Sequence, residues 1–190
     1  MVATRAAILD AARPILLRDG LGGTTLDRVA AEGGVAKMTL YRHFPSKEAL
    51  FEGLVAALCG EMRAAVEGAP APVGDRTPPS ALADELHAFT AALTELDALA
   101  FYRLVVADGW RFPGLARLFE QSGMEAVRRR VGAILLGGGV PAGQVGQRAA
   151  EVVALALGDA FQRAVLGIAR GDESQAFARQ IEGAVRHAFR

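Results

Sequence analysis

Hydrophobic positions recur at helical spacing along the whole chain, and no segment shows the alternation that a half-buried strand needs. Stretches rich in glycine and proline divide this pattern, most clearly GAPAPVGDRTPP at positions 68–79. The pattern predicts nine helices, which cover residues 5–18, 24–33, 36–43, 46–62, 80–95, 97–108, 113–136, 143–169 and 173–189. We therefore expect an all-α protein with a small N-terminal three-helix domain and a larger C-terminal helical bundle.

Several residues are typical of helix ends or breaks. Pro14 predicts a kink in the first helix, because proline removes one backbone donor, and Gly20 predicts a left-handed stop after it. Thr24 with Asp27 is typical of a capping box that begins the second helix, and Ser46 is a favourable N-cap for the fourth.

The short third helix, AKMTLYRH at positions 36–43, has few residues suited to packing. A helix of this length is unstable alone, so its neighbours must hold it. Ala30 allows the second helix to approach closely, and Gly34 can take the positive φ of a tight turn. Val35 and Leu40 can then fill the angle between the two helices, and Phe44 is expected to be a third buried anchor. This spacing predicts a helix-turn-helix.

The polar face of the short helix is expected to lie in a DNA groove. Lys37, Met38 and Thr39 are at its N-terminal end, which usually meets base edges in the major groove. Thr24 and Thr25 precede free N–H groups that favour a phosphate, and a phosphate would also relieve the unfavourable placement of Lys47 in a first helical turn. The predicted DNA-binding residues are Thr24, Thr25, Lys37, Met38, Thr39, Tyr41, Arg42, His43 and Lys47.

Composition narrows the function further. The formal net charge of the 190 residues is zero, so any DNA binding needs a local patch of positive charge. The single cysteine, Cys59, excludes an internal disulfide and suits a reducing cytosol. No run approaches the roughly 18 apolar residues of a membrane span, and no signal segment is present, so we expect a soluble cytoplasmic protein with no membrane partner.

Metal binding and catalysis have little support. Three scattered histidines and one cysteine make no ligand cluster, so no metal or cofactor is expected. No serine or cysteine has a credible base partner, so we do not expect an enzyme.

The segment TTLDRVAAEGGVAKMTLYRHFPSKEALFEGLV, at positions 24–55, resembles the DNA-binding domain of the tetracycline-repressor (TetR/AcrR) family of bacterial transcriptional regulators. Its threonine pair, Gly-Val turn, T-L-Y-x-H-F and S-K-E-x-L carry the resemblance, and FYRLVVADGWRFPGLARLFEQSG is more weakly similar to some of the family's C-terminal domains. Pro14 departs from the family, which usually has a helix former there. The resemblance implies a TetR-like nine-helix fold, with a DNA-binding domain over residues 1–46 and an effector-binding and dimerisation domain over 47–190.

The resemblance also implies a homodimer formed by the last two long helices. The segment 143–169 is apolar over more than one face, and such a helix must be buried on more than one side. A central core helix in a monomer is the alternative explanation. The residues predicted for the dimer interface are Val153, Leu157, Phe161 and Val165.

An effector pocket inside the larger bundle is a third implication of the resemblance. Its lining, predicted by position only, comprises Leu58, Met62, Phe89, Leu93, Phe101, Leu104, Trp110 and Phe112. Side chains of these types at helical spacing can equally be plain core.

The resulting hypothesis is a ligand-responsive regulator, most simply a repressor, that binds a palindromic operator as a homodimer. A small, largely apolar effector in the C-terminal bundle would shift the fourth helix and release the DNA. One alternative is a DNA-binding dimer without an effector. Another is a small helical enzyme acting on an apolar substrate, which would need a convergent polar site.

Overall fold

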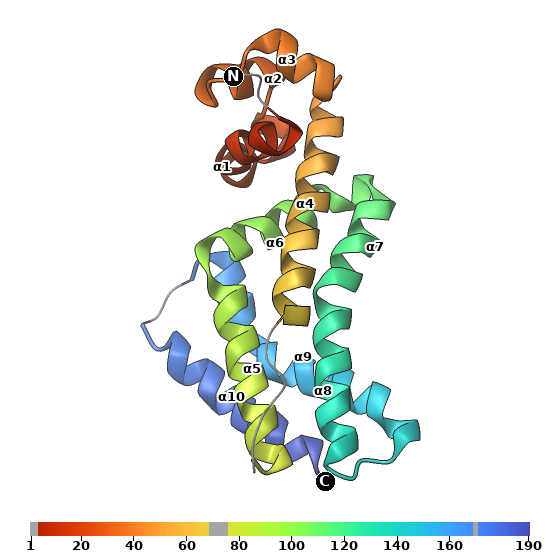
Figure 1. Cartoon of the computed structure of the whole chain (residues 1–190). Coiled ribbons are helices and arrows are strands. Elements are labelled where there is room, and N and C mark those ends of the chain that lie inside the picture. Colours follow the sequence, from red (N-terminus) through yellow and green to blue (C-terminus); the bar gives the residue numbers. More distant parts are fainter. Residues whose placement is uncertain (1–3, 69–75, 169–170) are drawn as a thin grey trace. The chain divides into compact units, whose positions relative to one another are not determined.

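The computed structural model describes residues 4–68, 76–168 and 171–190, and these contain helices and no strand (Figure 1). The predicted connector at 68–79 lies mostly outside these residues, as does position 169. The elements are α1 (Arg5–Gly23), α2 (Leu26–Glu32), α3 (Lys37–His43), α4 (Lys47–Gly68), α5 (Pro78–Thr94), α6 (Leu96–Asp108), η1 (Gly109–Arg111), α7 (Pro113–Ser122), α8 (Met124–Gly137), α9 (Ala142–Leu166) and α10 (Glu173–Ala188). The predicted all-α class is confirmed.

The one change in helix count comes from Gly123. Its backbone leaves the helical region, with φ −107° and ψ −86°, and divides the predicted helix 113–136 into α7 and α8. The described residues therefore form ten α-helices and one short 3₁₀ turn. The predicted N-terminal helix-turn-helix and C-terminal helical domain are both present.

The start of α2 differs from the predicted capping box by one residue. Thr25 is the N-cap, and its hydroxyl accepts a hydrogen bond from the N–H of Arg28 at 3.2 Å. Thr24 is buried and donates its hydroxyl to the carbonyl of Gly20 at 2.7 Å. Gly20 has the predicted positive φ, 67°, but with ψ −178° it kinks α1 and does not end it, and the backbone at Pro14 stays helical.

The chain forms two compact units. The first comprises Met1–Met62 and Ala100–Ser122, and the second comprises Arg63–Leu99 and Gly123–Arg190. The helices α4 and α6 thus each contribute to both units. The functional division between residues 46 and 47 stays a prediction, because compactness and function need not share a boundary.

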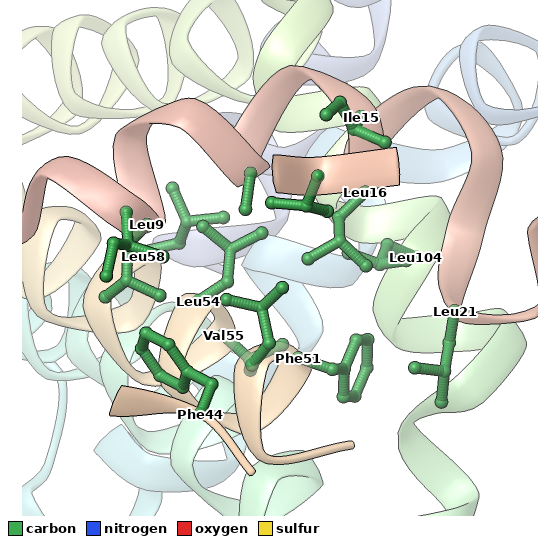
Figure 2. Packing of buried hydrophobic residues seen from close by; sticks show 14 of the residues in the cluster. Leu9, Ile15, Leu16, Leu21, Phe44, Phe51, Leu54, Val55, Leu58 and Leu104 are labelled. Carbon is green, nitrogen blue, oxygen red and sulfur yellow. The ribbon is translucent and has the colours of Figure 1, made fainter. Parts of the chain in front are cut away.

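The core of the first unit joins the N-terminal helices to α4 and to the end of α6. Figure 2 shows buried side chains of α1, including Leu9 and Leu16, gathered with Phe44, with Leu54 of α4 and with Leu104 of α6. Aromatic contacts extend this core, since the rings of Phe51 and Phe112 have centroids 5.0 Å apart and those of Phe101 and Phe119 5.3 Å apart. The helix-turn-helix therefore shares one hydrophobic core with residues 101–119.

The second unit is a bundle of α5, α8, α9 and α10, whose buried residues include Leu86, Leu135, Val152 and Ile181. Within it, α9 is interrupted at Gly158, where φ is 39° and ψ is −145°. No described helix of either unit is long and apolar enough to cross a membrane.

Gln180 of α10 satisfies the polar groups that this interruption frees. Its amide, oriented by its hydrogen-bond partners, donates to the carbonyl of Leu157 at 3.0 Å. The amide oxygen accepts from the N–H groups of Asp159 at 2.9 Å and Ala160 at 3.2 Å. A Cβ at Gly158 would lie only 2.6 Å from an end atom of this amide, so a larger residue there would displace the Gln180 side chain.

Candidate nucleic-acid interface

The turn between α2 and α3 is built from two glycines. Gly33 ends α2 and donates its N–H to the carbonyl of Val29 at 2.9 Å. Gly34 has φ 64°, as predicted, and the N–H of Val35 then reaches the carbonyl of Ala30 at 3.0 Å. A Cβ on Gly33 would lie 2.8 Å from the Cβ of Ala11, so α1 closes tightly on the turn.

Three buried anchors hold α3, and they are those predicted from the spacing: Val35, Leu40 and Phe44. Leu40 is the only buried residue within the described span of α3 itself. The other residues of the helix are exposed or half-buried, and Met38 is 84% exposed. A short helix thus presents a polar face because a single leucine and its flanking anchors fix it to the core.

An aspartate of α2 contacts two residues on this face. One carboxylate oxygen of Asp27 lies 3.0 Å from Nζ of Lys37. The other accepts a hydrogen bond from the hydroxyl of Tyr41 at 3.3 Å. Lys37 and Tyr41 are predicted DNA-binding residues, whereas the role of Asp27 toward α3 was missed, because the sequence pattern suggests only a cap.

A network of charges ties α2 to α1. Arg18 contacts Asp19 at 2.9 Å and Glu32 at 3.2 Å, and Arg28 contacts the same two carboxylates. Hydrogen bonds from Arg18 lower the pKa of Asp19, and those from Arg28 and then Arg18 lower the pKa of Glu32. The two acids and two arginines neutralise each other, so this network adds no net charge to the domain.

The start of α4 is fixed by two polar side chains. Ser46 caps the helix as predicted, because its hydroxyl accepts from the N–H of Ala49 at 3.1 Å. Lys47 is half-buried and donates to the carbonyl of Leu21 at 3.2 Å. This carbonyl, together with any phosphate, offsets the unfavourable position of the lysine at a helix N-terminus. The N–H of Leu21 donates to the carboxylate of Asp108 at 3.3 Å. The backbone of Leu21 is therefore held by two side chains, Lys47 at its carbonyl and Asp108 at its N–H.

The remaining predicted DNA-binding residues differ in how exposed their side chains are. Thr24 is buried and its hydroxyl donates to the carbonyl of Gly20, so a phosphate contact would require that hydroxyl to turn away; this contact stays a prediction. Thr25 and Arg42 are exposed, while Thr39 and His43 are half-buried.

Arg5 is a cation of this domain that the sequence pattern did not single out. Its guanidinium carbon lies 4.9 Å above the ring centroid of Phe44, one of the three anchors. This contact joins the first turn of α1 to the end of α3. It links residues far apart in sequence, and no local spacing indicates it.

The predicted effector-pocket residues fall in both units. Leu58, Phe101, Leu104 and Phe112 belong to or pack against the first core, and Met62 is half-buried in the same unit. Phe89 and Leu93 are half-buried in the second. Trp110 is 76% exposed and donates its indole N–H to the carbonyl of Ala107 at 3.0 Å. The pocket itself stays a prediction.

A surface groove of about 380 Å³ lies in the second unit, between α5 and α8. Its lining includes Ala81, Ile134 and the ion pair of Glu85 with Arg130, whose two contacts measure 2.6 and 2.8 Å. None of the predicted pocket residues lines this groove.

Two of the four predicted dimer residues are covered within their own protomer. Val153 and Phe161 are 1% and 7% exposed, because other helices of the unit pack against α9 on more than one side. Leu157 and Val165 are half-buried. Part of the apolar surface of α9 is therefore internal core of the protomer. For that part, the alternative explanation of a central core helix holds.

Two features of the described residues concern metal binding and thiol chemistry. They contain no group of three or more histidine, cysteine, aspartate or glutamate residues able to hold a metal ion. Burial raises the pKa of the Cys59 thiol to about 11, which keeps it protonated and a poor nucleophile.

Comparisons with known proteins match both parts of the chain. Residues 8–54 match the profile of bacterial regulatory proteins of the tetR family. Residues 80–190 match the C-terminal domain of AefR-like transcriptional repressors. No curated protein matches the sequence.

Solved structures resemble the whole chain. The flavonoid-responsive regulator FrrA is 30% identical, with TM-score 0.72, and the match covers 97% of this chain and 94% of that one. A TetR family transcriptional regulator from Pseudomonas syringae pv. tomato is 26% identical, with TM-score 0.70 and the same coverage. A third structure, from Mesorhizobium loti and described as a TetR-family regulator, reaches TM-score 0.82 at 22% identity, covering 97% of this chain and 94% of that one.

Proposed function

Because the chain belongs to the TetR family of bacterial transcriptional regulators, we propose that it represses transcription by binding a palindromic DNA operator as a homodimer in the cytoplasm. The observation that carries the proposal is the outward face of α3. Lys37, Met38 and Tyr41 are exposed on a helix whose inner side is anchored by buried Leu40. A helix placed in this way can enter the major groove without disturbing the core behind it.

The contacts divide by the kind of group each side chain offers. Lys37 can donate to guanine O6 and N7, while the methyl groups of Met38 and Thr39 suit a thymine methyl. Tyr41, Arg42, His43 and Lys47 are donors suited to phosphate oxygens, which position the protein without reading sequence. Thr25 remains a candidate for a phosphate next to α2.

Dimerisation follows from the weakness of a single helix-turn-helix. Two copies on a twofold axis read a palindrome with half-sites one helical turn apart or a multiple of it. The apolar residues that α9 leaves exposed include Leu155 and Leu166, at 45% and 68% exposure. We place the dimer contact on this outer side of α9 together with half-buried Leu157 and Val165.

The effector proposed here is a small, largely apolar molecule. FrrA, the relative at 30% identity, is flavonoid-responsive, and a flavonoid is an aromatic molecule of this class. An effector that binds one conformation of the C-terminal domain more tightly would shift the population and alter DNA affinity. The route proposed for the signal runs through Asp108 at the end of α6, which contacts Leu21, and through Leu21 to Lys47.

Selection of bound duplexes from a random pool tests the DNA-binding proposal. The expected result is enrichment of one palindromic sequence, lost in Tyr41→Ala and retained in Tyr102→Phe, which alters a half-buried tyrosine of α6 outside the helix-turn-helix. Failure to enrich any sequence at moderate salt would refute the proposal. Titration of the operator complex with flavonoids and fatty acids then separates an effector-responsive protein from a DNA-binding dimer without an effector.

A further inference from the structure

Asp27 places a negative charge on the face that is proposed to meet DNA. Its carboxylate is shared between Lys37 and Tyr41, with one oxygen for each partner, at 3.0 and 3.3 Å. The side chains of Asp27 and Lys37 are 59% and 62% exposed, so the pair lies in solvent. In the protein without DNA, Lys37 is thus already engaged.

Folding gives little reason for this arrangement. An exposed ion pair contributes little to stability, because solvent screens it and both side chains lose freedom. The angle between α2 and α3 is already fixed by the glycine turn and by buried Val35 and Leu40. A carboxylate beside phosphates also opposes DNA binding through like-charge repulsion.

We propose that Asp27 is a positioning residue that determines DNA specificity. This inference rests on the proposed DNA-binding function. Non-specific binding comes almost entirely from cations that meet phosphates and release counterions. On non-operator DNA, Asp27 repels the phosphates and keeps Lys37 from joining them. On the operator, the same carboxylate holds Lys37 and Tyr41 in place beside the groove, so that less side-chain freedom is lost on binding.

The test compares wild type with Asp27→Asn, which keeps an acceptor for Tyr41 but removes the charge. Equilibrium affinities are measured for the selected operator and for an unrelated duplex of equal length, across a range of salt concentrations. For the unrelated duplex, Asp27→Asn should bind at least about threefold more tightly, and its salt slope should steepen by about 0.9 per DNA-bound subunit as Lys37 becomes free to meet a phosphate. The affinity for the operator should increase less, so the ratio of operator affinity to non-specific affinity falls.

Three further variants make the test specific. Asp27→Glu should restore the ratio. Glu32→Gln removes the same charge from the same helix, but its partners are Arg18 and Arg28 rather than residues of α3, and it should change both affinities alike. In a Lys37→Gln background, Asp27→Asn should no longer steepen the salt slope, because coupled residues are not additive. Thermal unfolding of each variant checks that the fold is intact.

Each other outcome overturns the inference. Equal changes in affinity for the two duplexes would mean that the charge of Asp27 acts on all DNA binding and does not determine specificity. Loss of operator affinity with unchanged non-specific affinity would mean that Asp27 contacts a base directly. If wild type itself fails to discriminate between the duplexes, the proposed function fails before the role of Asp27 is reached.

Discussion

The carboxylate of Asp108, the last residue of α6, accepts a hydrogen bond from the backbone N–H of Leu21, in the last turn of α1. The two residues are 87 positions apart and belong to the same compact unit. The carbonyl of Leu21 is taken by Lys47 at the start of α4. One residue of the N-terminal domain is therefore held from both α6 and α4.

Replacing Asp108 tests how much this contact contributes. Asp108→Ala leaves the Leu21 N–H without its acceptor, so the free energy of unfolding should fall by about 1–2 kcal/mol. Asp108→Asn keeps an oxygen acceptor and should lose less. Urea unfolding measures both, and Asp10→Ala, which removes an exposed carboxylate from α1, serves as the control. An unchanged midpoint for Asp108→Ala would show that the contact has no energetic weight.

Gly34→Ala tests the geometry of the helix-turn-helix. A Cβ at Gly34 would meet nothing within 4 Å, so any cost comes from the backbone, whose φ is 64°. An alanine in this left-handed region should destabilise the protein by about 1–2 kcal/mol and weaken operator binding. Gly22→Ala is the matched control, because that position is equally open and has no positive φ. Equal stability of the two variants would contradict the assigned turn.

Gln180→Leu tests the interruption of α9. Leucine keeps the approximate size of the side chain but leaves the carbonyl of Leu157 and two N–H groups without partners, which should cost about 2 kcal/mol or more. Hydrogen exchange at Asp159 and Ala160 should accelerate with it. Gln175→Leu, at an exposed position of the same helix, should change neither quantity. Unaltered exchange in Gln180→Leu would indicate that the amide does not bridge the break.

A pH-dependent contribution is expected from the contact between α9 and α10 at Glu151. Its carboxylate lies 2.8 Å from Nε2 of His187, and hydrogen bonds from His187 and then Gln147 lower its pKa below the ordinary 4.5. A carboxyl group with a lowered pKa in the folded state adds stability above about pH 4.5, and this is lost as the pH falls through the lowered value.

In Glu151→Gln the free energy of unfolding should therefore fall less steeply as the pH drops below about 5. At neutral pH the variant should be less stable than wild type. Chemical unfolding at several pH values measures the effect. His187→Ala should flatten the same region, and the double variant should add little to either single change. A wild-type slope retained in Glu151→Gln would exclude this residue as the source.

The helix-turn-helix could be predicted because its determinants are local. Gly34, Val35 and Leu40 act within a few residues of one another, and their spacing defines the turn and the anchors. The N-cap was misassigned by one residue, because Thr24 and Thr25 are both good caps. Only the contact of Thr24 with Gly20 decides between them.

The rest depends on tertiary contacts that periodicity does not contain. An apolar residue type does not reveal whether Trp110 faces solvent, or whether Val153 is covered by its own protomer. Likewise, the polar contacts of Asp108 and Gln180 join residues on different helices and have no spacing signal. Gly123 fits a helical pattern, so the division of α7 from α8 could not be foreseen.

Hydroxyl-radical footprinting on the selected operator tests the central claim most directly. Two copies of α3 in successive major grooves should protect two equal patches about one helical turn apart, or a multiple of it, related by the twofold axis of the palindrome. Both patches should fade together in Tyr41→Ala while the protein stays folded. A single patch, or protection that persists unchanged in this variant, would contradict the account.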